Sequence, residues 1–519
     1  MTPAVLARRA LTGATALRGG RPWRPTPYQL AGLLCWLTLS LAFWAVPLCC
    51  DAGLHAAAVE RLRDDLLHPR HPTAALPGAG SPAYSPYSLA QGAVARLTGL
   101  GGREVLRLTG PLNLLVLIVG LGRFVRMLTP RRWAPVLALV AMTSLWAAEG
   151  AGWSGGPGLL PPAATLAYPS VLALGLTCWA WALTGARARD AGPVRHVGPC
   201  GLRGPSGWAA LGVLYGLVLL VHPATAPAAG LGAVALVAGE QRGWRPAVAA
   251  RWALTGAVAL LAGAVWPYFD VFDPAVWRGA GAEHRHLYRG LAGVFWPVLL
   301  GLPALWLRVR RGSPRDPLVL MAVLGGAVAA YGWTSGRPAG ARALGLVVVA
   351  ALCALAVELA APRPWPAGRW VLCVAAAAGF CAGLLTVHAG AVVPRALDPV
   401  GAVQPPRWPD YTWAVRHIGR GEAVVTDDPR AALTLPGYGA DLAAPTVPDP
   451  ALDELERQRR LAGVRVVLDP GSTRAERAGV VRRLRVRWLL LTPRTPVPPE
   501  AVVVTWSPRT GEVLARIGG

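Results

Sequence analysis

Long uncharged apolar segments constrain this chain more than any other feature. Segment 28–50 contains no charged residue, and about 20 predominantly apolar residues are enough to cross a bilayer. Only 15% of the 519 residues are charged, against roughly 25% in a soluble domain. We therefore predict an α-helical polytopic membrane protein. The other candidate spans, which bring the total to about eleven, are 108–122, 133–148, 163–185, 207–221, 224–239, 252–269, 290–307, 317–336, 343–361 and 370–393.

The basic residues, all of them arginine, are distributed unevenly between the two sides that eleven spans define. The loops on the side of the N-terminal tail hold 22 arginines, and the loops on the opposite side hold 11. The positive-inside rule then places the N-terminus in the cytoplasm and the C-terminus outside, in a multi-pass protein of the plasma membrane. The net charge of +24 is explained by this topology, so we predict the lipid bilayer and no nucleic acid as a partner.

The chain divides into a basic cytoplasmic tail (1–27), a transmembrane domain (28–394) with a first outer loop at 51–107, and an extracytoplasmic α/β domain (395–519). In the last part, 422–426, 464–468 and 486–491 have the composition of strands, and helices are expected near 450–461 and 472–484. This order predicts a short parallel sheet, followed by a strand pair at 501–505 and 511–516. Asp427, Asp428 and Asp469 are interpreted as turn and cap residues rather than ligands.

Acidic and histidine side chains gather in the predicted outer loops, so any chemistry is expected on the outer face. Asp51 follows the first span directly, and His55 lies four residues later, on the same face of a helix. Leu54, Ala58 and Leu62 recur at the same spacing, which predicts an amphipathic helix on the membrane surface. Asp51 is either a functional carboxylate or an interfacial cap.

Other outer segments contain candidate binding residues. Tyr84 and Tyr87 belong to a proline-rich loop that suits either a sugar or lipid pocket or an interfacial aromatic belt. The loop from Trp266 to Arg289 combines acidic residues with arginines that could bind a phosphate or form salt bridges within the loop. His222 could donate a hydrogen bond to a ligand. No spacing is diagnostic of a metal, so no cofactor is certain and a divalent ion remains possible.

These motifs resemble those of the GT-C superfamily of membrane glycosyltransferases. The resemblance rests on Asp51 with His55, the 84–87 stretch, Tyr168-Pro169-Ser170 and His222-Pro223. It implies an enzyme that moves a sugar from a polyprenyl-phosphate donor to an extracytoplasmic glycan, lipid or protein of the cell envelope. Relatives often carry a second acidic residue beside the first; Ala52 stands there, and Glu149 could replace it.

Under this hypothesis Asp51 is the general base of an inverting transfer, and an arginine of the 278–289 loop stabilises the departing phosphate. The expected donor- or acceptor-binding residues are His55, Tyr84, Tyr87, Glu149, Tyr168, His222, Asp270, Arg278, Arg285 and Arg289. Two alternatives remain. A transporter or lipid flippase would need ionisable residues inside the spans, where Glu358 is the main exception. A non-catalytic envelope scaffold would use the C-terminal domain as a binding module.

Overall fold

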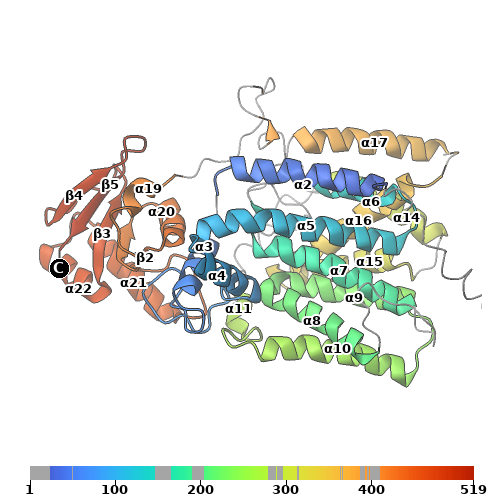
Figure 1. Ribbon diagram of the computed structural model, residues 1–519, viewed down its shortest axis with the longest axis horizontal. Coiled ribbons are helices and arrows are strands. Elements are labelled where there is room, and N and C mark those ends of the chain that lie inside the picture. Colours follow the sequence, from blue (N-terminus) through green and yellow to red (C-terminus); the bar gives the residue numbers. More distant parts are fainter. Residues whose placement is uncertain are drawn as a thin grey trace, which may run out of the picture.

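A computed structural model describes residues 24–48, 51–145, 165–189, 204–278, 288, 296–311, 315–362, 364, 366–385, 392–393, 397 and 409–518. A bundle of long helices forms one part of the molecule and a small sheet with short helices forms the other (Figure 1). Six described helical segments are long and apolar enough to cross a membrane: α2 (Pro27–Ala45), α5 (Gly102–Leu128), α7 (Pro169–Arg189), α10 (Pro246–Ala264), α15 (Pro317–Thr334) and the continuous segment Pro338–Leu359.

The remaining predicted spans are also helical in the structure. They form α6 (Ala134–Ser144), α8 (Pro205–Val221), α9 (Ala226–Glu240), η3 (Trp296–Gly301) with α14 (Leu302–Arg311), and α17 (Ala367–Gly383). Segment Pro338–Leu359 consists of η4 (Pro338–Ala343) and α16 (Leu344–Leu359). Each predicted apolar segment thus contains a helix. The division of the long apolar stretch near His222 is confirmed, since α8 and α9 meet there at a bend of 119°.

Several ion pairs connect helix ends on the side that we predict to be cytoplasmic. This end of the bundle lies away from the sheet (Figure 1). Glu358 accepts hydrogen bonds from both Arg311 and Arg369. Arg189 pairs with Glu240 across two helices. Glu358 was the main ionisable residue inside a predicted span. It is paired with arginines at a helix end, as is usual for a charge near a membrane boundary.

The C-terminal sheet has five strands in the order β2-β1-β3-β5-β4. They are β1 (Ala423–Thr426), β2 (Asp441–Leu442), β3 (Val486–Leu491), β4 (Ala501–Trp506) and β5 (Val513–Ile517). β1 runs parallel to β2 and β3, whereas β5 pairs antiparallel with β3 and β4. The predicted final strand pair is confirmed, and so is the cap formed by Thr473 and Glu476 on α22 (Arg474–Leu484).

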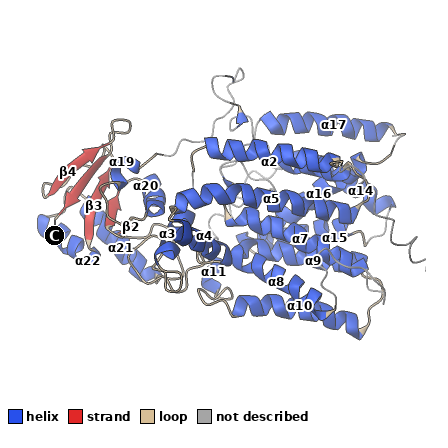
Figure 2. Ribbon diagram, viewed as in Figure 1, coloured by secondary structure: helices blue, strands red, loops and turns tan. Residues whose placement is uncertain are grey.

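The prediction of a strand at 464–468 was wrong. These residues form the last turns of α21 (Glu454–Leu468), as Figure 2 shows. Val464, Val467 and Leu468 recur at helical spacing and pack with residues of α22 and the sheet. The same apolar run is therefore compatible with a strand or with a helix, and tertiary packing decides between the two. The parallel part of the sheet is completed instead by β2, which the sequence did not indicate.

The first outer loop lies between the helical bundle and the sheet (Figure 1). It contains α3 (Ala52–Asp64) and α4 (Pro86–Thr98). The predicted helix is present, and its polar face is covered by protein. Residues 56–62 are all buried, including Glu60 and Arg61, because α4, α5 and the C-terminal domain surround α3. That domain approaches through α20 (Pro429–Thr434) and η7 (Leu435–Tyr438).

Candidate active site

Asp51 occupies the N-cap position of α3, and its side chain is half-buried. The carboxylate does not cap the helix. The backbone N–H of His55 donates to the Asp51 carbonyl oxygen at 3.1 Å, so the helix brings both residues to one face, as their spacing predicts. Burial lowers the pKa of His55, and the neighbouring Asp51 carboxylate opposes that shift. The lowered pKa favours the neutral form of the His55 imidazole.

Tyr168 completes this cluster from a distant part of the chain. It lies in the turn directly before α7, and its buried ring meets the His55 ring edge-on. The ring centroids are 4.9 Å apart and the ring planes are inclined by 68°, a favourable geometry for two aromatic rings. The structure thus joins Asp51, His55 and Tyr168, three residues singled out from the sequence.

A buried hydrogen-bond network holds the turn that carries Tyr168. The Tyr87 hydroxyl donates to the Ala167 carbonyl at 2.9 Å. The Asn113 side-chain amide donates to the Tyr87 hydroxyl at 2.8 Å and to the Leu166 carbonyl at 3.0 Å. Sequence reasoning missed Asn113. Its signal was present, because an amide side chain within an apolar span such as 108–122 normally marks a polar contact inside the protein.

Tyr84 is buried and joins the first outer loop to the segment before α11 (Pro274–Arg278). Its hydroxyl donates to the Arg70 carbonyl. Its own carbonyl accepts from the Trp266 indole at 2.9 Å, and its ring lies 6.3 Å from that of Tyr268. These contacts tie together two outer loops that lie far apart in the sequence.

The other candidate residues make local contacts or fall outside the described part of the chain. His222 Nδ1 lies 2.7 Å from the Thr225 hydroxyl, in the turn between α8 and α9. Asp270 is exposed and accepts from the Phe272 N–H at 2.8 Å, as a turn residue does. Glu149, Arg285 and Arg289 lie outside the described residues, and only the backbone of Arg278 is described. Among the described residues, no group of three or more histidine, cysteine or acidic side chains could hold a metal.

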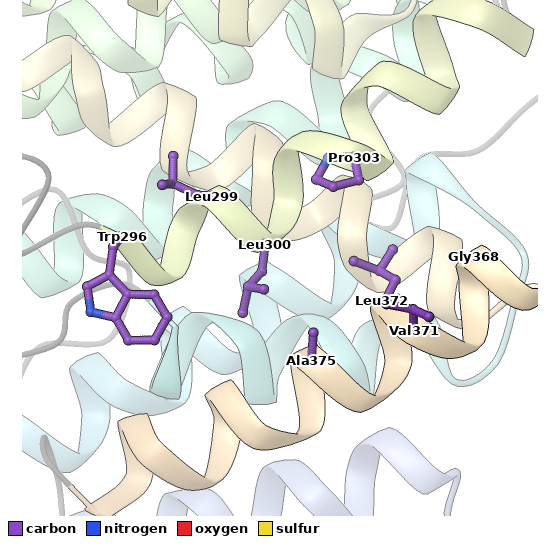
Figure 3. Close-up of a pocket in the computed structure, with 8 residues that line it drawn as sticks. All are labelled: Trp296, Leu299, Leu300, Pro303, Gly368, Val371, Leu372 and Ala375. Carbon is purple, nitrogen blue, oxygen red and sulfur yellow. The ribbon is translucent and has the colours of Figure 1, made fainter.

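An apolar groove lies between the η3–α14 segment and α17 (Figure 3). Its volume is about 380 Å³, and all its lining residues are uncharged. They are Trp296, Leu299, Leu300, Pro303, Gly368, Val371, Leu372 and Ala375. A groove of this composition suits a hydrocarbon chain.

Solved structures of similar architecture indicate the class of fold. AftD, an arabinofuranosyltransferase from Mycobacteria, matches 95% of this chain with 16% identity and a TM-score of 0.55. This chain spans 40% of the AftD chain. ArnT from Cupriavidus metallidurans, solved with bound undecaprenyl phosphate, matches 95% of this chain and 98% of its own, with 14% identity and a TM-score of 0.52. No family model and no curated protein sequence matches this chain.

The arrangement of apolar helices and the C-terminal sheet defines a polytopic membrane protein with a small α/β domain. AftD and ArnT belong to the GT-C superfamily of membrane glycosyltransferases. The chain has the GT-C fold.

Proposed function

We propose that this protein is a membrane glycosyltransferase that moves a sugar from a polyprenyl-phosphate donor to an extracytoplasmic acceptor. The observation that carries the proposal is the cluster of Asp51, His55 and Tyr168 within a GT-C fold. The cluster brings the start of α3, in the first outer loop, against the turn that begins α7. The apolar groove along α17 supports the proposal, since it can take a hydrocarbon chain.

In the proposed reaction, Asp51 accepts the proton of an acceptor hydroxyl as that oxygen attacks the anomeric carbon. A new carbon–oxygen bond forms on one face of the sugar while the bond to the phosphate oxygen breaks on the other. The configuration inverts, and polyprenyl phosphate leaves with the electron pair. Burial lowers the pKa of His55, so its imidazole stays neutral in this reaction. Arg278, Arg285 and Arg289 are the proposed partners of the departing phosphate.

We also propose the orientation of the chain. The N-terminus lies in the cytoplasm, and the α/β domain lies outside with the site. Sugars linked to a membrane lipid reach that face without a soluble nucleotide donor. The excess of arginine in the loops opposite the α/β domain supports this orientation.

The experiment is a transfer assay with purified full-length protein and a panel of radiolabelled polyprenyl-phosphate sugars. Wild type should transfer label from one donor, and Asp51→Asn should lose at least a hundredfold in kcat while remaining folded. Asp469→Asn is the control, because Asp469 is an exposed cap at the end of α21. Equal transfer by wild type and Asp51→Asn would remove Asp51 as the base. Flux of a lipid or solute into liposomes without turnover would favour a transporter.

A further inference from the structure

The C-terminal domain contacts α3 at both ends of the helix. Near the N-terminal end, a Cβ atom on Gly53 would lie only 2.0 Å from the Leu433 carbonyl oxygen, so the two backbones touch. Near the C-terminal end, the Arg61 guanidinium reaches the same domain at Gly439, Ala440 and Asp441. Arg61 follows Asp51 by ten residues, or about 15 Å of helix. One continuous stretch, residues 433–441, therefore contacts α3 from Gly53 to Arg61.

The contact at Arg61 is fully buried. The Arg61 side chain is 1% exposed, and that of Asp441 is 0% exposed. Asp441 also accepts from Arg70 at 3.0 Å, and Arg61 donates to the Ala440 carbonyl at 2.9 Å. Within the described part of the chain the Arg61 Nε–H has no acceptor. A buried ion pair contributes little net stability, because desolvation of the two charges offsets their attraction. The hydrogen bonds of Arg61 do, however, fix its position against residues 439–441.

Glu60 links α3 to both of its neighbours. One carboxylate oxygen accepts from the Gly102 N–H at 2.5 Å, at the start of α5. The other oxygen pairs with Arg420 of the C-terminal domain. The opposite side of α3 is held as closely, since a Cβ on Gly92 of α4 would lie 2.3 Å from Leu62 Cβ. The helix is therefore fixed between the membrane bundle and the C-terminal domain.

From these contacts we infer that the C-terminal domain is part of the catalytic apparatus, with Arg61 and Asp441 as positioning residues that set the place of Asp51 through α3. The inference rests on the proposed function. A rigid helix held at both ends cannot rotate, so its first residue keeps a fixed place. Loosening the Arg61 end lets α3 tilt about the Gly53 contact, which moves Asp51 relative to the bound sugar. Misplacement of that kind lowers the rate of transfer more than the binding of the donor.

The test compares Asp441→Asn with Asp427→Asn in the full-length protein. Both substitutions remove one carboxylate charge from the C-terminal domain. Among the described residues, however, the hydrogen bonds of Asp427 stay within that domain: it accepts from the Thr492 N–H at 2.8 Å and the Thr495 hydroxyl at 2.7 Å. We expect Asp441→Asn to lower kcat at least tenfold, with KM for the lipid-linked sugar within twofold of wild type. Asp427→Asn should keep kcat within twofold even if its Tm falls, and Asp441→Glu should recover part of the activity.

Equal kcat for Asp441→Asn and wild type, or an equal loss in Asp427→Asn, would overturn the inference. Should Asp441→Asn not fold, Arg420→Gln takes its place. The Arg420 side chain is 46% exposed and contacts Glu60 and Asp64. A severalfold lower kcat in this variant supports the inference, and an unchanged kcat contradicts it.

Absence of transfer by wild type would contradict the proposed function and leave the docking of the domain to a separate measurement. Hydrogen exchange of the α3 amides then tests whether the C-terminal domain holds α3 in place. Faster exchange in Asp441→Asn than in Asp427→Asn supports positioning of α3 by the domain, and equal exchange contradicts it.

Discussion

The Arg61 guanidinium and the Asp441 carboxylate, 380 positions apart in the sequence, form an ion pair that is shielded from water on all sides. The pair joins the first outer loop to the C-terminal domain. A second connection runs beside it, where the Leu442 N–H donates to the Thr73 carbonyl at 2.7 Å and the loop extends the edge of the sheet. The loop and the domain therefore form one folded unit, although the membrane helices separate them in sequence.

Removing one partner of this pair should destabilise the protein strongly. Arg61→Met removes the buried partner of Asp441 and leaves it paired with the half-exposed Arg70, so we expect the free energy of unfolding to fall by about 3–5 kcal/mol. Arg63→Met is the matched control, since Arg63 is 27% exposed and 3.8 Å from Glu60; its loss should be below about 1 kcal/mol. Denaturant unfolding in detergent measures the free energy of unfolding of both variants. Similar losses in the two would contradict the structural importance of the Arg61–Asp441 pair.

The close approach of Gly53 to the C-terminal domain predicts a steric effect. Gly53→Ala would place a methyl group 2.0 Å from the Leu433 carbonyl, so α3 or residues 433–434 must shift. We expect transfer activity to fall at least tenfold and the Tm to decrease. Gly479→Ala in α22, where nothing lies within 4 Å of the new atom, should leave both unchanged. Normal activity in Gly53→Ala would show that α3 tolerates displacement.

The Tyr87 hydroxyl should matter for activity through the turn that carries Tyr168. Tyr87→Phe removes the hydrogen bond to Ala167 and the acceptor of Asn113. Loss of one hydrogen bond costs about 1 kcal/mol net. If this bond stabilises the transition state and not the bound ground state, kcat should fall roughly fivefold. Tyr215→Phe is the control, because Tyr215 loses a comparable contact with Thr184 at 2.9 Å. Equal effects of the two substitutions on kcat would argue against a specific role for this turn.

Stability should decline in mild acid because of His71. This side chain is 1% exposed, and its Nε2 has no partner among the described residues. Burial lowers its pKa; Asp449 and Asp441 oppose the shift, and Arg61 and Arg460 add to it. The unfolded chain binds a proton near pH 6.5, whereas the folded chain resists protonation. Stability is therefore complete above that pH and falls below it.

The loss should reach about 1.4 kcal/mol per pH unit for one proton. His71→Asn should flatten the decline between pH 7 and pH 5, whereas a substitution at the exposed His68 should not. Parallel curves of Tm against pH for wild type and His71→Asn would exclude His71 as the source.

The proposed orientation can be tested by labelling intact cells with a membrane-impermeant maleimide. In a cysteine-free background, Arg509→Cys near the end of the sheet should react directly. Arg310→Cys in α14 should react only after the membrane is permeabilised. Both positions are exposed in the fold. The reverse pattern would place the C-terminal domain in the cytoplasm and remove the extracytoplasmic site.

The sequence by itself determined the positions of the apolar helices and several local features of the site. Apolar runs identify helices because a lipid environment selects for hydrophobicity over about 20 consecutive residues. The spacing of Asp51 and His55, the Thr473 cap and the strand pair near the C-terminus were equally readable. Each depends on residues only a few positions apart, so local geometry is sufficient.

Only the tertiary structure decided the environment of α3, the helical state of 464–468 and the role of Asn113. An amphipathic helix on the membrane surface would turn its polar face, with Glu60, toward water. It meets Arg420 and Asp441 instead. Likewise, Tyr168 reaches His55 from more than a hundred positions away. Contacts between residues this far apart produce no short-range pattern in the sequence. A buried charge, in turn, is tolerated only when the fold supplies its partner.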